Sequence, residues 1–244
     1  MSDDTTQRDA EAGHDKPQRR IKSYVLRQGR LTQAQQHALQ HHWDRFGIDY
    51  SPVLLDLNQV FGNDRPVTVE VGFGNGESLL EQAKRHPEQN YIGIEVHGPG
   101  VGHLIHFAHQ SGLSNLRVIR HDAVEVLRDQ LPAGSISCLQ LFFPDPWHKK
   151  RHHKRRIIKP EFLELIHQVL IPGGLFHMAT DWQDYAEYML EQMEQADGFE
   201  NTAGKGNYAD SRGERTETRF ELRGKRLGHG VWDLMYRKIS GYKT

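Results

Sequence analysis

The chain has 244 residues, enough for one large domain or two small ones, and its 31 Lys and Arg residues nearly balance its 32 Asp and Glu residues. A net charge near zero excludes any inference about an anionic partner from the whole composition, so only local clusters of charge bear on that question. The single cysteine excludes an internal disulfide, and the lack of an apolar run of roughly 20 residues excludes a membrane-spanning helix, which together predict a cytoplasmic protein.

The N-terminal part of the chain precedes the region in which strands are expected. Residues 1–20 are polar, contain no aromatic residue and lack the apolar stretch of a signal peptide, so their composition predicts a disordered tail. Residues 21–62 are expected to form a helical extension, in which Thr32 caps a helix and Gly47 lies just past its end. Residues 63–244 are then expected to form one α/β domain.

Short apolar runs alternate with helical patterns from Val67 onward. The runs that predict strands are VTVEV (67–71), YIGIEV (91–96), LRVIR (116–120), ISCLQLFF (136–143) and LFHMAT (175–180). Helical patterns separate them, another helix follows at 182–196, and residues 231–238 alternate as a last strand should. Strands joined through helices predict a mostly parallel sheet with helices on both faces, as in Rossmann-like folds.

A glycine-rich turn follows the first predicted strand. Gly72, Gly74 and Gly76 let the backbone approach a ligand closely, but the third glycine comes one position too early for the dinucleotide fingerprint. The strand also ends in a carboxylate, Glu70, which would repel a pyrophosphate and attract a cation. The turn therefore predicts a nucleoside cofactor that carries positive charge, and S-adenosylmethionine fits that description.

Acids follow the next three predicted strands as well, namely Glu95, Asp122 and Asp145. The carboxyl ends of parallel strands meet at one edge of a sheet, where ligands bind, so Glu95 is expected at the ribose hydroxyls and Asp122 at the adenine amino group. Each acid taken alone has an alternative as a helix cap or a solvated loop residue, and for Asp122 the cap is favoured. The conjunction with the glycine turn favours a methyl-donor site.

A basic segment, residues 149–156, begins four residues after Asp145. It contains six cations: Lys149, Lys150, Arg151, Lys154, Arg155 and Arg156. A solvated loop or a localisation signal is the ordinary explanation for such a run. Its position at the ligand-binding edge instead favours contact with a nucleic-acid phosphate backbone. Trp147 is left with two roles of equal weight, stacking on a base or anchoring the loop by packing.

Other residues that resemble functional sites are expected to be inert. His103, His106 and His109 recur every three residues along one predicted helix, but no carboxylate or cysteine is spaced to complete a zinc site, so no metal is expected. Cys138 lies inside a buried strand pattern, which favours an unreactive thiol over a nucleophile.

Several motifs in order resemble bacterial tRNA (guanine-N7-)-methyltransferases: EVGFGNG, IGIEV, FFPDPWHKKRHHKRR, ATDW and TRFELRG followed by LGHGVWDL. The resemblance extends from about Tyr24 to Lys238. It implies that residues 63–244 form a class I S-adenosylmethionine-dependent methyltransferase domain with an antiparallel last strand. The implied reaction is methylation of N7 of guanosine 46 in the variable loop of tRNA.

The resemblance also implies roles for single residues. Glu70, Glu95, Asp122 and Asp145 would line the S-adenosylmethionine site beside the glycine turn, and Lys149 with residues 151–156 would contact tRNA. The substrate would be met by Asp181, Thr218, Arg219, Phe220 and Glu221. Arg219 stands where the family usually has lysine, which keeps the charge but not the geometry. Thr218 and Glu221 also have the spacing of a helix capping box.

The predicted reaction needs no general base, because N7 of guanine has a free lone pair. Asp145 and Asp181 end neighbouring strands and are the candidates to stabilise the positive charge that appears on the ring, with Asp145 as the catalytic residue. Asp181 has an alternative as a helix N-cap. The rival hypothesis is a non-catalytic RNA-binding protein with a nucleotide-binding fold, which would need none of the strand-end acids. The sequence leaves open whether the protein is a monomer or a homodimer.

Overall fold

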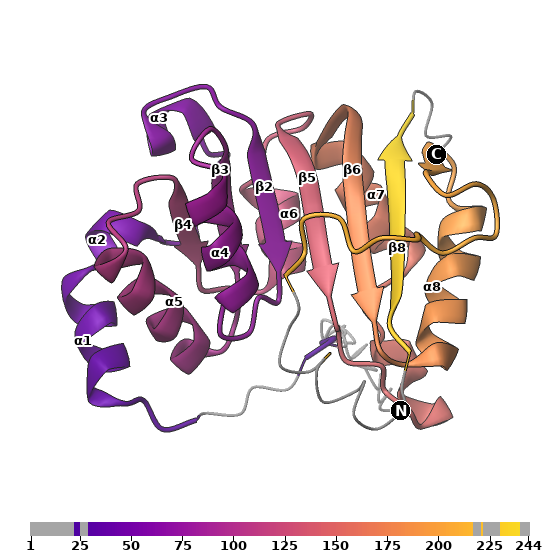
Figure 1. Ribbon diagram of the computed structural model, residues 1–244, viewed down its shortest axis with the longest axis horizontal. Helices are drawn as coiled ribbons and strands as arrows, with labels where there is room; N and C mark the ends of the chain where they lie inside the picture. Colours follow the sequence, from indigo (N-terminus) through magenta and orange to yellow (C-terminus); the bar gives the residue numbers. More distant parts are fainter. Residues whose placement is uncertain (1–21, 25–28, 217–220, 222–229, 240–244) are drawn as a thin grey trace, which may run out of the picture.

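The computed structural model describes residues 22–24, 29–216, 221 and 230–239, so the predicted tail at 1–20 lies outside the described residues (Figure 1). Within them, one eight-stranded sheet has the order β1-β4-β3-β2-β5-β6-β8-β7. All neighbours pair in parallel except β8, which is antiparallel to both β6 and β7. The predicted mostly parallel sheet with an antiparallel last strand is confirmed. The strands are β1 (Gly47–Ile48), β2 (Val67–Val71), β3 (Asn90–Ile94), β4 (Leu116–Ile119), β5 (Ile136–Phe142), β6 (Leu170–Thr180), β7 (Phe199–Asn201) and β8 (Trp232–Lys238).

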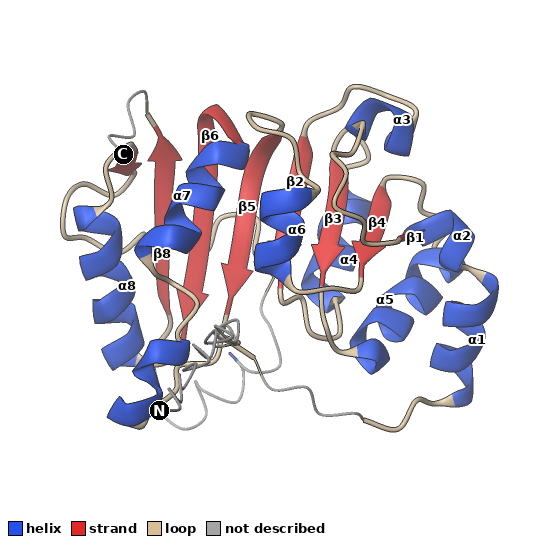
Figure 2. Ribbon diagram, turned by 180° about the vertical axis from the view of Figure 1, so that it is seen from behind, coloured by secondary structure: helices blue, strands red, loops and turns tan. Residues whose placement is uncertain are grey.

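Helices cover both faces of the sheet, as predicted (Figures 1 and 2). One apolar cluster joins the sheet to α1, α4 and α5, and the other joins it to α6, α7 and α8. Among the described residues, no helix combines the length and the apolar character needed to cross a membrane. The helices are α1 (Gln33–His41), α2 (Trp43–Phe46), α3 (Leu57–Phe61), α4 (Glu77–Arg85), α5 (Gly98–Gln110), α6 (Ala123–Asp129), α7 (Pro160–Val169), α8 (Gln183–Gln195) and the short 3-10 helix η1 (Lys150–Arg155).

The N-terminal extension differs from its prediction in one respect. Thr32 caps α1 through a capping box with Gln35, as the sequence indicates, but the helix ends at His41 and a second helix, α2, follows. Gly47 lies just past a helix end, as expected, but that helix is α2, and the same residue begins β1. The Trp43 ring lies where a side chain at Gly47 would stand, 2.2 Å from its Cβ, so the position requires glycine. Since β1 pairs with β4, the extension adds a strand to the sheet. The division into residues 1–20, 21–62 and 63–244 stays a prediction.

One part of the sheet is covered by an irregular segment. Residues 202–216 cross β8, β6 and β5 on the face that carries α4 and α5 (Figure 1). Ala209 N–H donates to the Asp233 carbonyl at 2.8 Å, and the Glu214 carboxylate lies 3.0 Å from His86 Nε2 at the end of α4. The segment is therefore fixed at both a strand and a helix.

The turn between β2 and α4 is held closely against the start of α5. A Cβ at Gly100 would lie 1.9 Å from the Gly74 carbonyl oxygen, and His103 Nδ1 lies 2.8 Å from the Asn75 carbonyl oxygen. Only glycine at position 100 permits this approach. Helix α5 therefore packs against the backbone of the glycine turn and fixes its position.

Gly100→Ala is expected to lower the free energy of unfolding by about 1–3 kcal/mol, the usual cost of forcing an extra methyl group into a filled space. Gln110→Ala, at the exposed end of the same helix, should change it by only a few tenths of a kcal/mol. Urea unfolding of both variants measures the difference. Equal stability of the two variants would contradict the close approach.

Candidate active site

Glu70 is a buried carboxyl group in β2, with 4% of its surface exposed. Burial, and then the charge of Glu95, raise the pKa of Glu70 to about 8. Its Oε2 atom is buried and has no hydrogen-bond partner among the described residues. A buried acid with an unsatisfied oxygen fits a ligand that brings a cation or an N–H donor.

The glycine turn follows Glu70 directly. Gly72, Gly74 and Gly76 have φ values of 72°, 59° and 75°, the left-handed region that side chains disfavour. At Gly72 and Gly74 a Cβ would meet nothing within 4 Å, so the backbone conformation, and not crowding, requires glycine there. The turn thus presents bare backbone to open space at the carboxyl edge of the sheet.

Glu95 lies just after β3 and ties the glycine turn to that strand. Its carboxylate accepts hydrogen bonds from Gly74 N at 3.0 Å, Val96 N at 2.7 Å and His97 N at 2.9 Å. A carboxylate has about four acceptor sites, so these three bonds leave capacity for one more donor. The predicted contact with ribose hydroxyls stays a prediction, and Glu95 has a structural role beside it.

Asp122 is the N-cap of α6, which is the alternative that the sequence favours for this residue alone. Its Oδ1 accepts from Val124 N at 3.0 Å, and the side chain is 8% exposed. A cap uses only part of the carboxylate's acceptor capacity. The contact with adenine therefore stays a prediction that the cap does not exclude.

Asp145 projects from a strained turn, residues 143–147, here called the Asp145 turn. Phe143 and Trp147 have φ values of 51° and 49°, and both are bulky residues for which this conformation is costly. Asp145 is exposed, and no hydrogen bond or ion pair joins it to another described residue. Strain of this kind gathers at functional sites, so the turn is a candidate for the catalytic position.

Trp147 has the geometry of a packing anchor. Its indole N–H donates to the Ser23 carbonyl at 3.1 Å, and the Arg155 guanidinium lies 4.4 Å from its ring centroid. One polar group and one ring face are thus already in use. This arrangement favours the anchor over base stacking.

The basic segment separates into exposed and buried cations. Lys149, Lys150, Arg151 and Lys154 are exposed, and Arg155 is half-buried. Arg156 differs from the expected phosphate contact: it is 2% exposed, donates to the Pro146 carbonyl at 3.0 Å and forms an ion pair with Asp184.

The rings of Tyr185 and Tyr188 lie 4.8 and 4.9 Å from the Arg156 guanidinium. A guanidinium with these partners fastens the basic segment to α8. It could meet a phosphate only by breaking them, so the structure disfavours Arg156 as a direct contact.

Asp181 lies at the end of β6 beside a pocket of about 650 Å³. It is not a helix cap, because the N-cap position of α8 is Trp182, which makes no capping hydrogen bond from its side chain. The pocket lining combines acids with aromatic rings: Asp181, Trp182, Gln183, Asp184, Glu187, Gly230 and Trp232. Such a lining suits a flat, electron-poor ring.

Glu221 does not lie free beside the Asp145 turn. It is 3% exposed, and Arg215 donates to its Oε2 at 2.5 Å. Thr218, Arg219 and Phe220, and with them the predicted capping box, lie outside the described residues. In the structure, Glu221 forms a buried ion pair with Arg215. Direct contact between Glu221 and substrate stays a prediction.

The remaining polar candidates are Cys138 and the histidines of α5. Burial raises the pKa of the Cys138 thiol to about 12, so it stays protonated at neutral pH. The described histidines, cysteine and acids form no group of three or more that could hold a metal ion.

Comparison with known proteins identifies the family. A family model described as "Putative methyltransferase" matches residues 64–234. A protein of Vibrio cholerae named tRNA (guanine-N(7)-)-methyltransferase is 57% identical over 98% of this chain and all of its own length. A protein of Aeromonas hydrophila with the same name is 57% identical over 91% of this chain and 94% of its own. The chain belongs to this methyltransferase family.

Solved structures agree with the fold of the family. The 16S rRNA methyltransferase KamB aligns with a TM-score of 0.57 at 19% identity, covering 76% of this chain and 94% of its own. A 16S rRNA (adenine(1408)-N(1))-methyltransferase from Catenulisporales acidiphilia aligns with a TM-score of 0.53 at 14% identity, covering 80% and 94%. At these identities the likeness shows a class I methyltransferase fold alone.

Three residues that the structure places at the candidate site are not among the candidate residues predicted from the sequence. Gly100 supports the glycine turn, Arg215 holds Glu221, and Trp232 lines the pocket beside Asp181. Gly98-Pro99-Gly100 at a strand-to-helix turn is a signal for the first. Trp232 lies in the motif LGHGVWDL and in the predicted last strand, but neither pattern places its ring beside Asp181. Arg215 lies in a stretch with no local pattern that marks it.

Glu70→Gln is expected to stabilise the free protein at neutral pH. The pKa of Glu70 lies near 8 in the fold against an ordinary 4.5, so the unfolded chain releases this proton over an interval in which the folded chain retains it. The contribution of protonated Glu70 to the free energy of unfolding is therefore fully present below pH 4.5. It is lost as the pH rises towards 8, at about 1.4 kcal/mol per pH unit. Glutamine does not titrate and avoids this loss.

Melting temperatures measured from about pH 4 to about pH 9 test this linkage. The advantage of Glu70→Gln over the parent should grow through the interval and level off above pH 8. Glu200→Gln, an exposed glutamate in β7, should follow the parent throughout. Parallel curves for Glu70→Gln and the parent would show that Glu70 titrates normally.

Proposed function

We propose that this protein transfers the methyl group of S-adenosylmethionine to N7 of a guanosine in tRNA, guanosine 46 of the variable loop. The names of its relatives support the reaction and the substrate. The observation within the chain that supports it best is Glu70, whose buried, unsatisfied carboxyl group lies beside the glycine turn. A tRNA substrate also favours a cytoplasmic protein.

The residues at the carboxyl edge fit S-adenosylmethionine. The cofactor supplies a methyl group activated by a sulfonium, and its amino group adds a second positive charge. Glu70 would balance that charge, while the bare backbone at Gly72 and Gly74 admits close approach. Glu95 and Asp122 each retain acceptor capacity for the nucleoside.

The proposed role of the protein in the reaction is to align guanine and to stabilise charge on it. N7 has a free lone pair, so no side chain has to remove a proton before attack. Alignment alone accounts for about 7–11 kcal/mol of barrier in well-oriented reactions. Asp145 and Asp181 follow the paired strands β5 and β6, where carboxylates would stabilise the positive charge developing on the ring.

The exposed cations of the basic segment are the proposed contacts with tRNA phosphates. Lys149, Arg151 and Lys154 project from the segment that begins at the Asp145 turn, and Arg155 joins them with its exposed part. Arg156 acts indirectly, because its ion pair with Asp184 fixes the segment to α8. The phosphates would thus be bound next to the acid that meets the ring.

A non-catalytic RNA-binding protein is the weaker alternative. It would use the same exposed cations, but it would have no use for Glu70, a buried acid whose raised pKa lowers the stability of the fold at neutral pH. Methylation separates the two hypotheses directly. Purified protein incubated with tRNA and labelled S-adenosylmethionine should yield 7-methylguanine at one variable-loop position, whereas tRNA that is bound without becoming labelled would favour the alternative.

Asp145→Asn is expected to lower the single-turnover rate by about 10²–10³, corresponding to about 2.7–4 kcal/mol, because it removes a charge aimed at the developing cation. The melting temperature and the tRNA affinity should stay near those of the parent, because Asp145 is exposed and has no described partner. The same change at Asp64, an exposed residue before β2, should leave the rate unchanged. A parent-like rate for Asp145→Asn would refute the proposed charge stabilisation.

The double variant Arg151→Ala/Lys154→Ala is expected to weaken tRNA binding and to flatten its dependence on salt. Each lost phosphate contact should lower the slope of log K against log salt by about 0.7. A matched double variant at Arg65 and Lys84, two exposed cations outside the basic segment, should retain the parent slope. Binding titrations at several salt concentrations give the slopes. Equal slopes for both variants would show that the basic segment is a solvated loop that does not contact tRNA phosphates.

A further inference from the structure

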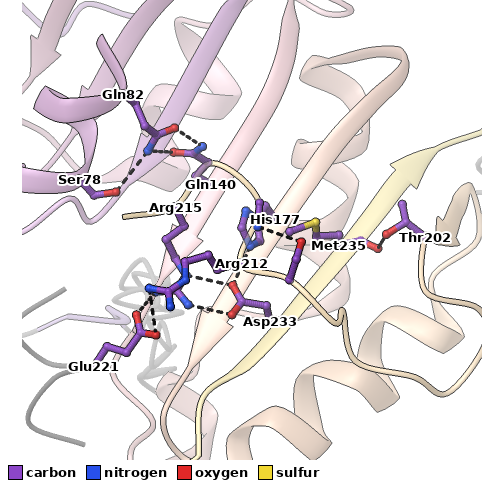
Figure 3. A network of polar contacts seen from close by, with 12 residues as sticks. Ser78, Gln82, Gln140, His177, Thr202, Arg212, Arg215, Glu221, Asp233 and Met235 are labelled. Atoms are coloured by element: carbon purple, nitrogen blue, oxygen red, sulfur yellow. Dashed lines mark hydrogen bonds and ion pairs between the residues drawn. The ribbon is translucent and has the colours of Figure 1, made fainter. Parts of the chain in front are cut away.

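Arg215 is a buried arginine, 2% exposed, at the centre of a polar network (Figure 3). Its Nε donates to Asp233 Oδ1 at 3.0 Å and its Nη2 to Asp233 Oδ2 at 2.8 Å, which is a bidentate pair. Its Nη1 donates to Glu221 Oε2 at 2.5 Å. His177 Nε2 completes the network 2.8 Å from Asp233 Oδ1. One guanidinium thus joins β8 to Glu221.

Each buried charge in this network is stabilised by its oppositely charged partners, as the pKa shifts of Asp233 and Arg215 show. Burial alone would raise the pKa of the Asp233 carboxyl, but hydrogen bonds from His177 and Arg215 hold it below its ordinary value. Burial would likewise lower the pKa of Arg215, and its hydrogen bonds to Asp233 and Glu221 raise it instead. Removing the guanidinium would leave two buried carboxylates without their main cation.

The same guanidinium also lies against the Asp145 turn. Its carbon atom is 5.3 Å from the Phe143 ring centroid and 5.8 Å from that of Phe142, within the range of cation–π contact. Phe143 is the residue with positive φ that leads into Pro144 and Asp145, and its N–H donates to the Ala179 carbonyl at 2.8 Å. The Asp145 turn is therefore fixed at Phe143, whose backbone is bonded to β6 and whose ring packs against Arg215.

We infer that Arg215 is a positioning residue for methyl transfer: it holds Glu221 in a fixed place relative to the turn that presents Asp145. The inference rests on the proposed function. Arg215 does not touch substrate, because it is buried and each of its three side-chain nitrogens already donates to a carboxylate.

Fastening residues 202–216 to the sheet does not by itself require the contact with Glu221. Ala209 and Glu214 already fix that segment to β8 and to α4, and the bidentate pair with Asp233 fixes it again. The remaining donor goes to Glu221, which follows directly after Thr218-Arg219-Phe220 in the sequence. The guanidinium thus connects Glu221 to the Asp145 turn, and both belong to the proposed substrate site.

Arg215→Lys tests the inference, because lysine keeps the charge and loses the fork that bridges two carboxylates. The single-turnover rate should fall by about 100-fold, the effect of a small misplacement of reacting groups, while the affinity for S-adenosylmethionine stays at the parent value. Arg117→Lys is the matched control, since Arg117 donates to three backbone carbonyls and packs on Phe61 in the distant part of the sheet. At a temperature below both melting transitions, the control should methylate at the parent rate.

The combination with Glu221→Gln shows whether Arg215 acts through Glu221. If it does, the double variant Arg215→Lys/Glu221→Gln should be no slower than the slower of the two single variants. Losses that multiply would mean that the two residues act separately, and a parent-like rate for Arg215→Lys would equally overturn the inference.

A second variant covers the case in which Arg215→Lys does not fold. Asp233→Asn keeps the shape and some hydrogen bonds of the network, and Asp233 lies in β8 with 6% exposure. Its rate should also fall at unchanged cofactor affinity, and a parent-like rate would overturn the inference. A parent protein that does not methylate tRNA would overturn the proposed function and this inference together, whereas an active parent with an equally active Arg215→Lys would overturn the inference alone.

Discussion

A carboxylate leaves water at low cost only when cations or N–H groups replace the water, and this constraint organises the protein. Asp233 and Glu221 are buried against the Arg215 guanidinium, and Glu95 is surrounded by three backbone N–H groups. Glu70 is buried with an oxygen that no described group satisfies, and it meets the constraint by retaining its proton near neutral pH. Among the buried acids that the structure describes, the one with a buried oxygen that no other group satisfies lies beside the glycine turn.

The topology explains why that acid stands at a ligand site. From β2 the chain proceeds outward through β3 and β4 on one side, and through β5, β6 and β8 on the other. The order therefore reverses between β2 and β5, and ligands of open α/β sheets bind at such a point, outside the carboxyl ends of the strands. Glu70 and the Asp145 turn extend from these two strands. The cofactor and the base are thus proposed to meet at the carboxyl ends of β2 and β5, where the strand order reverses.

The sequence predicts the parts of this structure that local patterns determine. The alternating apolar runs locate five parallel strands, and Thr32 caps its helix as expected. The two-residue β1 and three-residue β7 escape detection, because strands so short have no periodicity to read. Gly47 lies just past a helix end as expected, but the predicted single helix is divided into α1 and α2 at His42, a break that no glycine or proline marks in the sequence.

Single charges are harder to predict than elements. Arg155 and Arg156 are neighbours of the same type in one basic run, yet only Arg156 is buried, because Asp184 and two tyrosines on α8 receive it. Arg215 likewise gains its role from Asp233, which is 18 residues away on another element. Such partners become neighbours only in the folded chain, so the sequence shows the cations but not which of them are free to bind an anion.

Proton release on binding of S-adenosylmethionine tests most directly whether Glu70 is the counterpart of the cofactor's positive charge. Titration calorimetry near pH 7, in buffers of different ionisation enthalpy, counts the protons released. The expected result is release of close to one proton by the parent, because the cation lowers a pKa that lies near 8 in the free protein, and no such release by Glu70→Gln. Equal proton release by both proteins, or none by the parent, would contradict it.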